Sequence, residues 1–140
     1  MDRDAPAIFA SNGVYTPSSW AFMTPPDETN LAALKSRGAK LLVYHGTGDP
    51  VFSFNDTSDW YARLAQANGG DASGFARFYP VPGMNHCSGG PAADQFDMLT
   101  PLVAWVEQGQ APAAIVATAR DASNVLPNAE VPTSWGAGRT

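Results

Sequence analysis

Two short runs of mainly apolar residues in the middle of the chain have the length and composition of β-strands. Residues 40–44 are almost wholly apolar and lie between two glycines, a pattern typical of a buried strand in a parallel sheet. Residues 75–81 are rich in aromatic side chains, alternate between apolar and polar at their start, and end before Pro82 and Gly83. We therefore predict a strand in each of these two segments.

Three further segments carry the signals of α-helices. A short helix is predicted over residues 31–37, where a glycine follows the last position. A second is predicted over 56–67 and a third over 94–108, because both place apolar residues three or four positions apart. The third ends before Gly109. Pro101 lies inside it, so we expect the proline to bend that helix or to open its second half.

From residue 40 onward the order of elements is strand, helix, strand, helix, which suits βαβ units with parallel strands. Two strands are too few for a stable doubly wound sheet, so the sequence indicates the last part of a larger α/β domain. We divide the chain into an irregular entry segment (1–30), the α/β part (31–109) and an irregular tail (110–140).

Charge and hydropathy exclude some classes of partner. The formal net charge of the 140 residues is −5, with 8 basic and 13 acidic side chains, so we expect no nucleic-acid binding. Apolar stretches such as residues 39–44, which Lys40 interrupts, are far shorter than the roughly 20 residues that cross a bilayer, so we expect no membrane partner. The first residues also lack the pattern of a signal peptide.

Candidate catalytic residues follow each predicted strand, where open α/β folds place functional loops. Asp49 lies in a Gly-rich loop after the first strand, and His86 lies in a second such loop 37 residues later. An acid followed by a histidine matches the later part of the Ser, Asp, His order of hydrolases, in which the carboxylate orients the imidazole that takes a proton from a hydroxyl. The alternatives are a plain turn at Asp49, a surface position for His86, and a packing or hydrogen-bonding role for His45.

A metal site is a weaker interpretation of the same residues. His45, Asp49, His86 and Cys87 are possible ligands, but no CxxC or HxxxH spacing supports them. We therefore expect neither a metal nor a cofactor. Cys87 is the chain's single cysteine, which excludes a disulfide within the chain.

A resemblance to a known family covers residues 31–120. The segment HGTGDP (45–50) and the segment FYPVPGMNHCSGGPAADQFDMLTPLVAWVEQGQAP (78–112) resemble the C-terminal part of the α/β-hydrolase domain of the tannase and feruloyl esterase family. The resemblance implies a partial α/β-hydrolase fold. It also implies that the parent protein is secreted or periplasmic.

The resemblance gives roles to three residues. It implies that Asp49 is the catalytic acid, that His86 is the base, and that Cys87 forms a disulfide with a cysteine that precedes the nucleophilic serine in the family. The family places that serine in a G-x-C-S-x-G-G turn far upstream, and no such turn occurs in this sequence. Its lid domain, which binds calcium and contacts the substrate, also lies upstream.

We therefore expect the acid-and-base part of a serine carboxylic ester hydrolase that acts on aromatic, phenolic-acid esters. Alone, this chain is expected to be inactive and to self-associate through its uncovered sheet. The geometric prediction is a distance of roughly 2.6–3.2 Å between a carboxylate oxygen of Asp49 and an imidazole nitrogen of His86. The alternative function is a non-catalytic binding or oligomerisation module of α/β-hydrolase ancestry.

Overall fold

The computed structural model describes residues 4–135. These fall into two compact units, with the division between Leu31 and Ala32. The first unit contains two short helices, α1 (Ala5–Ile8) and α2 (Ser19–Met23). The Ser18 hydroxyl accepts a hydrogen bond from the Ala21 N–H, which caps α2. No helix in the described part of the chain is both long and apolar enough to cross a membrane.

The centre of the second unit is a pair of parallel strands, β1 (Leu41–Gly46) and β2 (Ala76–Val81). Each begins one residue after the start that we predict, so both strand predictions are confirmed. Their register pairs Leu41 with Ala76 and Gly46 with Val81. The carboxyl ends of both strands therefore lie at the same edge of the sheet, and the loops that follow them are neighbours. The short helix α3 (Ala32–Ser36) precedes β1, within the predicted range 31–37.

Helix α4 (Phe54–Ala67) connects the two strands. It begins two residues before the predicted start, because the turn after β1 already places residue 53 in the N-cap position. Aromatic rings fasten it to β2: the ring centroids of Phe54 and Tyr61 lie 5.7 and 5.8 Å from that of Phe78. The α4 side of the sheet is thus held by aromatic packing.

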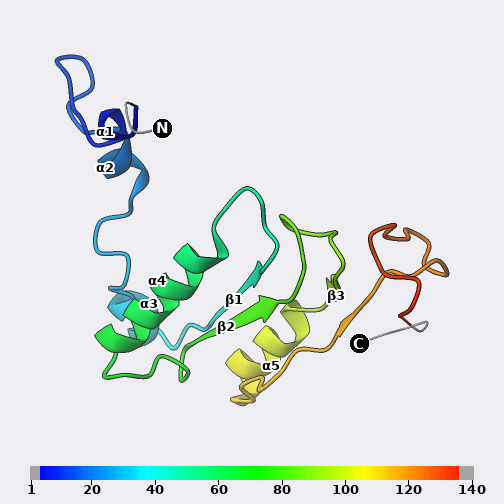
Figure 1. The fold of residues 1–140 in the computed structure, drawn as a ribbon. Coiled ribbons are helices and arrows are strands. Elements are labelled where there is room, and N and C mark those ends of the chain that lie inside the picture. The colour runs from blue at the N-terminus through cyan, green and yellow to red at the C-terminus, as the bar shows by residue number, and fades with distance from the viewer. Residues whose placement is uncertain (1–3, 136–140) are drawn as a thin grey trace. The chain divides into compact units, whose positions relative to one another are not determined.

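Helix α5 (Leu99–Gln108) covers the other side of the strand pair, as Figure 1 shows. Trp105 is buried, and the cationic groups of Lys40 and Arg77 lie 5.1 and 5.4 Å from its ring centroid. These cation–π contacts join α5 to β2 and to the residue that precedes β1. The helix ends at Gly109, which has a left-handed backbone (φ 71°).

The predicted start of this last helix, at residue 94, is wrong. Residues Gln95–Phe96 form strand β3, which pairs antiparallel with β4 (Ala117–Thr118). The Asp97 carboxylate accepts hydrogen bonds from the N–H groups of Leu99 and Thr100 and so starts the helix five residues later. The expectation that Pro101 bends the helix is also wrong, because Pro101 lies in the first turn, where no intrahelical N–H bond is lost.

Residues 110–135 are irregular apart from β4, but they pack on the strands and loops of the α/β part. The Pro112 carbonyl accepts hydrogen bonds from Arg77 (2.5 Å) and from the Tyr79 hydroxyl (2.6 Å), both on β2. The buried apolar residues of the described chain lie in and beside these elements: Leu64, Ala72, Phe75, Ala76, Val81, Met84, Ala92, Trp105 and Ala119. Parallel strands joined by a crossover helix confirm the predicted partial α/β fold.

Candidate active site

Asp49 lies in a tight turn directly after β1. Its Oδ1 accepts hydrogen bonds from the backbone N–H groups of Val51 (2.8 Å) and Phe52 (3.0 Å). An aspartate that bonds to the backbone two and three residues ahead stabilises a turn without help from distant residues. The carboxylate is only 5% exposed, and its Oδ2 points to the neighbouring loop.

His86 provides the partner of that second oxygen. Its Nδ1 lies 2.9 Å from Asp49 Oδ2, so the predicted distance is confirmed. Because a carboxylate only accepts hydrogen bonds, Nδ1 is the nitrogen that carries the proton, and Nε2 of the neutral ring keeps its lone pair. The His86 side chain is 43% exposed, so the ring is open to solvent beside a buried carboxylate.

Hydrogen bonds control the ionisation of Asp49. Burial by itself would raise the pKa of this carboxyl. The hydrogen bond from His86 and those from the Phe52 and Val51 N–H groups outweigh burial and hold the pKa well below its usual range. Asp49 is therefore ionised at neutral pH, as a group that stabilises an imidazolium must be.

His45, at the end of β1, braces the Asp49 turn. Its Nε2 lies 3.3 Å from the Phe52 carbonyl oxygen and 3.2 Å from Asp49 Oδ2. Both of these oxygens are acceptors, so Nε2 carries the proton, and Nδ1 accepts from the Thr57 hydroxyl at 2.8 Å. For His45, the structure therefore shows the hydrogen-bonding role that the sequence left open.

Hydrogen bonds from backbone N–H groups also connect the Asp49 loop with the His86 loop. The Thr47 N–H donates to the Val81 carbonyl at 3.0 Å, and the Gly83 N–H donates to the Thr47 hydroxyl at 2.9 Å. A Cβ atom at Gly46 would collide with the Met84 carbonyl oxygen, so only glycine allows this close approach. The Asp49 and His86 loops are therefore positioned by the backbone as well as by their side chains.

Cys87 follows His86 and has a left-handed backbone, with φ at +66°. This conformation is uncommon for a residue with a Cβ atom. Its thiol is free and exposed. The pairing of Cys87 with a cysteine from outside this sequence stays a prediction.

The sequence interpretation missed four polar residues that hold the His86 loop. Asp94, predicted as the first residue of a helix, instead forms an ion pair with Arg120. Asn128 and Glu130 bond to the backbone of Gly90. The other three, Arg120, Asn128 and Glu130, lie in the segment that we expected to be an irregular tail, where no periodic pattern identifies them.

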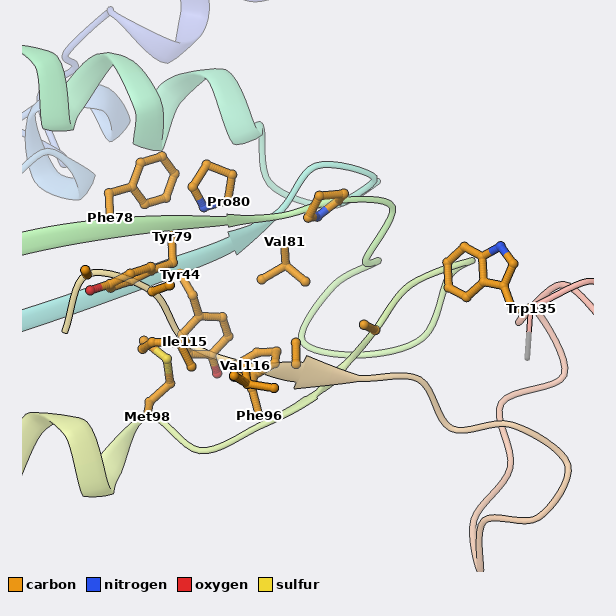
Figure 2. A pocket seen from close by; sticks show the side chains of 15 residues that line it. Tyr44, Phe78, Tyr79, Pro80, Val81, Phe96, Met98, Ile115, Val116 and Trp135 are labelled. Carbon is orange, nitrogen blue, oxygen red and sulfur yellow. The ribbon is translucent and has the colours of Figure 1, made fainter. Parts of the chain in front are cut away.

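A cavity of about 750 Å³ opens on the α5 side of the strand pair. Figure 2 shows Tyr44, Phe96, Ile115 and Val116 among the apolar side chains that line it. Neither Asp49 nor His86 is part of its lining. The exposed His86 imidazole and the buried Asp49 carboxylate therefore both lie outside this cavity.

Curated relatives share this part of the chain. Mono(2-hydroxyethyl) terephthalate hydrolase from Piscinibacter sakaiensis is 55% identical over 114 residues, which are 80% of this chain and 18% of that protein. Feruloyl esterase B from Aspergillus niger is 37% identical over 102 residues, covering 61% of this chain and 20% of the enzyme. The chain therefore spans about a fifth of the length of these relatives.

Solved structures show the same fold. An esterase from Aspergillus oryzae matches with a TM-score of 0.60 and 28% identity, over 69% of this chain and 23% of that structure. Feruloyl esterase B from the same organism matches with a TM-score of 0.57 and 29% identity, over 64% and 22%. The family model described as tannase and feruloyl esterase matches residues 19–140. The chain therefore belongs to the tannase and feruloyl esterase family of α/β-hydrolases.

Proposed function

We propose that this chain is the acid-and-base part of a serine carboxylic ester hydrolase. The observation that carries the proposal is the hydrogen bond from His86 Nδ1 to the ionised Asp49, which leaves the Nε2 lone pair of an exposed imidazole available as a base. The nucleophilic serine and its oxyanion hole come from polypeptide outside this sequence.

In the proposed reaction, the serine oxygen attacks the ester carbonyl carbon while His86 Nε2 takes the hydroxyl proton. The tetrahedral intermediate then collapses, the bond to the alcohol oxygen breaks, and Nε2 returns the proton to that oxygen. Water releases the acyl group by the same two steps, with Nε2 again acting first as base and then as acid. Asp49 keeps the proton on Nδ1 and stabilises the imidazolium in each half of the reaction.

An aromatic acyl group is the substrate class we propose. Phe52 is exposed, and its ring centroid lies 5.3 Å from that of His86, so an aromatic surface borders the base. The exposed Val51 extends this apolar border. The names of the relatives, which specify feruloyl and terephthalate esters, point to the same class of aromatic acid.

Complementation tests the proposal. The chain is co-expressed with the part of the Piscinibacter sakaiensis hydrolase that precedes the matched stretch, and hydrolysis of methyl ferulate and of a p-nitrophenyl ester is measured. We expect no turnover from either part alone and turnover from the two together. In the complex, Asp49→Asn and His86→Gln each reduce kcat by about 10³–10⁴-fold, because the base is lost or its tautomer changes.

Asp59→Asn, an exposed substitution on α4, is the matched control and leaves kcat unchanged. Stoichiometric labelling of a serine in the isolated chain by a fluorophosphonate would contradict the proposal, because the nucleophile would then lie within these 140 residues. Full activity of the His86→Gln complex would contradict the role of the imidazole.

A further inference from the structure

The loop that carries His86 is held by a segment that reaches it from far along the chain. We propose that residues 120–130, here called the strap, position His86 for proton transfer, with Glu130 and Arg120 as positioning residues. This role rests on the proposed function, because it concerns the same imidazole. The strap contributes no atom to the Asp49–His86 contact itself.

Glu130 and Asn128 hold Gly90 from both sides of its backbone. The Gly90 N–H donates to Glu130 Oε2 at 2.6 Å, and the Asn128 side-chain amide donates to the Gly90 carbonyl at 2.8 Å. The Asn85 amide also approaches Glu130 Oε2, at 3.5 Å. A hydrogen bond from an N–H to a carboxylate is about twice as strong as one between neutral groups, so Glu130 is the stronger of the two restraints.

Arg120 anchors the strap to the buried side of the loop. Its guanidinium donates to both carboxylate oxygens of Asp94, at 2.5 to 3.1 Å, and Asp94 Oδ2 in turn accepts from the Gly89 N–H at 2.8 Å. The Asp94 side chain is 0% exposed. Within the strap, the Asn128 N–H donates to the Arg120 carbonyl, so the two attachment points are linked to each other.

The loop needs such restraint because its backbone is unusual. Cys87, Gly89 and Gly90 all have positive φ, between 66° and 78°. The Asn85 N–H donates to the Gly89 carbonyl at 3.1 Å and closes a small ring of backbone that contains His86. Restraining Gly89 and Gly90 therefore restrains the backbone turn that carries His86 and directs its imidazole toward Asp49.

The tautomer of His86 reports this positioning directly. When the imidazole faces Asp49, Nδ1 carries the proton, whereas a neutral imidazole in water favours the proton on Nε2. With only two histidines in the chain, long-range ¹H–¹⁵N correlation spectra distinguish the two tautomers of each ring. The spectra are recorded on the 140-residue chain at a pH where both rings are neutral, so no enzymatic activity is required.

The test compares Glu130→Ala with the unchanged chain. We expect His86 to shift from the Nδ1–H toward the Nε2–H tautomer, and the Gly90 amide to exchange with solvent about tenfold faster, while the spectrum of His45 stays the same. Glu130→Gln keeps a carbonyl acceptor and should restore most of the Nδ1–H tautomer.

Two matched controls separate positioning from general stability. Glu107→Ala removes an exposed glutamate from α5 and should change neither readout. Leu64→Val removes one methylene from a fully buried side chain on α4 and should lower the urea midpoint, yet it should leave the tautomer of His86 unchanged.

An unchanged tautomer in Glu130→Ala would overturn the role of the strap while leaving the proposed function intact. Asp49→Asn provides the reference spectrum for a chain without the Asp49–His86 pair, because this substitution should abolish the preference for Nδ1–H. If His86 in the unchanged chain already matches the Asp49→Asn spectrum, the Asp49–His86 pair is not formed, and the proposed function and the strap fail together.

Discussion

The Asp49 turn and the His86 loop meet at one hydrogen bond, but they are held in different ways. The bonds that shape the Asp49 turn itself are short in sequence: its carboxylate accepts from backbone two and three positions ahead, and His45 accepts from Thr57, 12 positions ahead. The His86 loop is also held by partners 40 or more positions away, such as Glu130, which accepts from the Gly90 N–H and from the Asn85 amide. One half of the site is therefore encoded locally, and the other depends on the tertiary fold. Substitutions in the two halves should therefore differ in how much they lower stability and in whether they change the tautomer of His86.

The largest effect is expected at Gly90, where the loop is most crowded. A Cβ atom there would collide with the Gly83 carbonyl oxygen, and φ is +77°. Gly90→Ala should lower the free energy of unfolding by about 3 kcal/mol or more, measured by urea denaturation. Gly38→Ala is the matched control, because Gly38 has a similar φ (+71°) but open space around it, so it should cost only about 1–2 kcal/mol. Equal losses would show that crowding does not restrain the loop.

Arg120→Met tests the distant anchor. It leaves the buried Asp94 carboxylate without its cationic partner. Breaking a wholly buried ion pair costs about 3–5 kcal/mol, and because the Arg120 side chain is 19% exposed we expect a loss of about 2–3 kcal/mol. Differential scanning calorimetry measures the loss. An unfolding midpoint equal to that of the unchanged chain would show that the strap is attached only through Glu130 and Asn128.

Acid should weaken the same ion pair between Asp94 and Arg120. The hydrogen bonds from Arg120 hold the pKa of Asp94 below its ordinary value, against the opposing effect of burial. The unfolded chain therefore binds the proton first as the pH falls below about 4, and stability decreases by at most about 1.4 kcal/mol per pH unit for this one group. Asp94→Asn should flatten the dependence of the urea midpoint on pH between about 4 and 2. A slope as steep as that of the unchanged chain would assign the acid sensitivity to other carboxylates.

The smallest effect is expected in the locally held half. Thr57→Val removes the hydroxyl that donates to His45 Nδ1 and should cost about 1 kcal/mol. Because the backbone N–H groups of Val51 and Phe52 still hold Asp49, the Nδ1–H tautomer of His86 should persist. ¹H–¹⁵N spectra check this expectation. Loss of that tautomer would mean that His45 contributes as much to the pair as the Asp49 turn does.

The same contrast explains what could be predicted from the sequence. The two strands, the crossover helix and the contact between Asp49 and His86 follow from local patterns, because parallel strands bring the loops at their carboxyl ends together. The start of α5 and the attachment of residues 120–130 could not be predicted in this way. Asp94 satisfies a helix-start pattern, but Arg120 determines where its carboxylate lies, and no local signal connects residues 26 positions apart.

The register of β1 and β2 has a consequence for how the chain folds. Every paired residue in this sheet is separated from its partner by 35 positions, from Leu41 with Ala76 to Gly46 with Val81. Such non-local pairing must close a long loop before any contact compensates for the lost chain entropy, so it slows folding relative to a helical bundle of the same size. Asp49 and His86 meet only after this closure. Their hydrogen bond therefore reports a state in which this loop is already closed, and the Nδ1 proton of His86 can be used to follow that closure in refolding experiments.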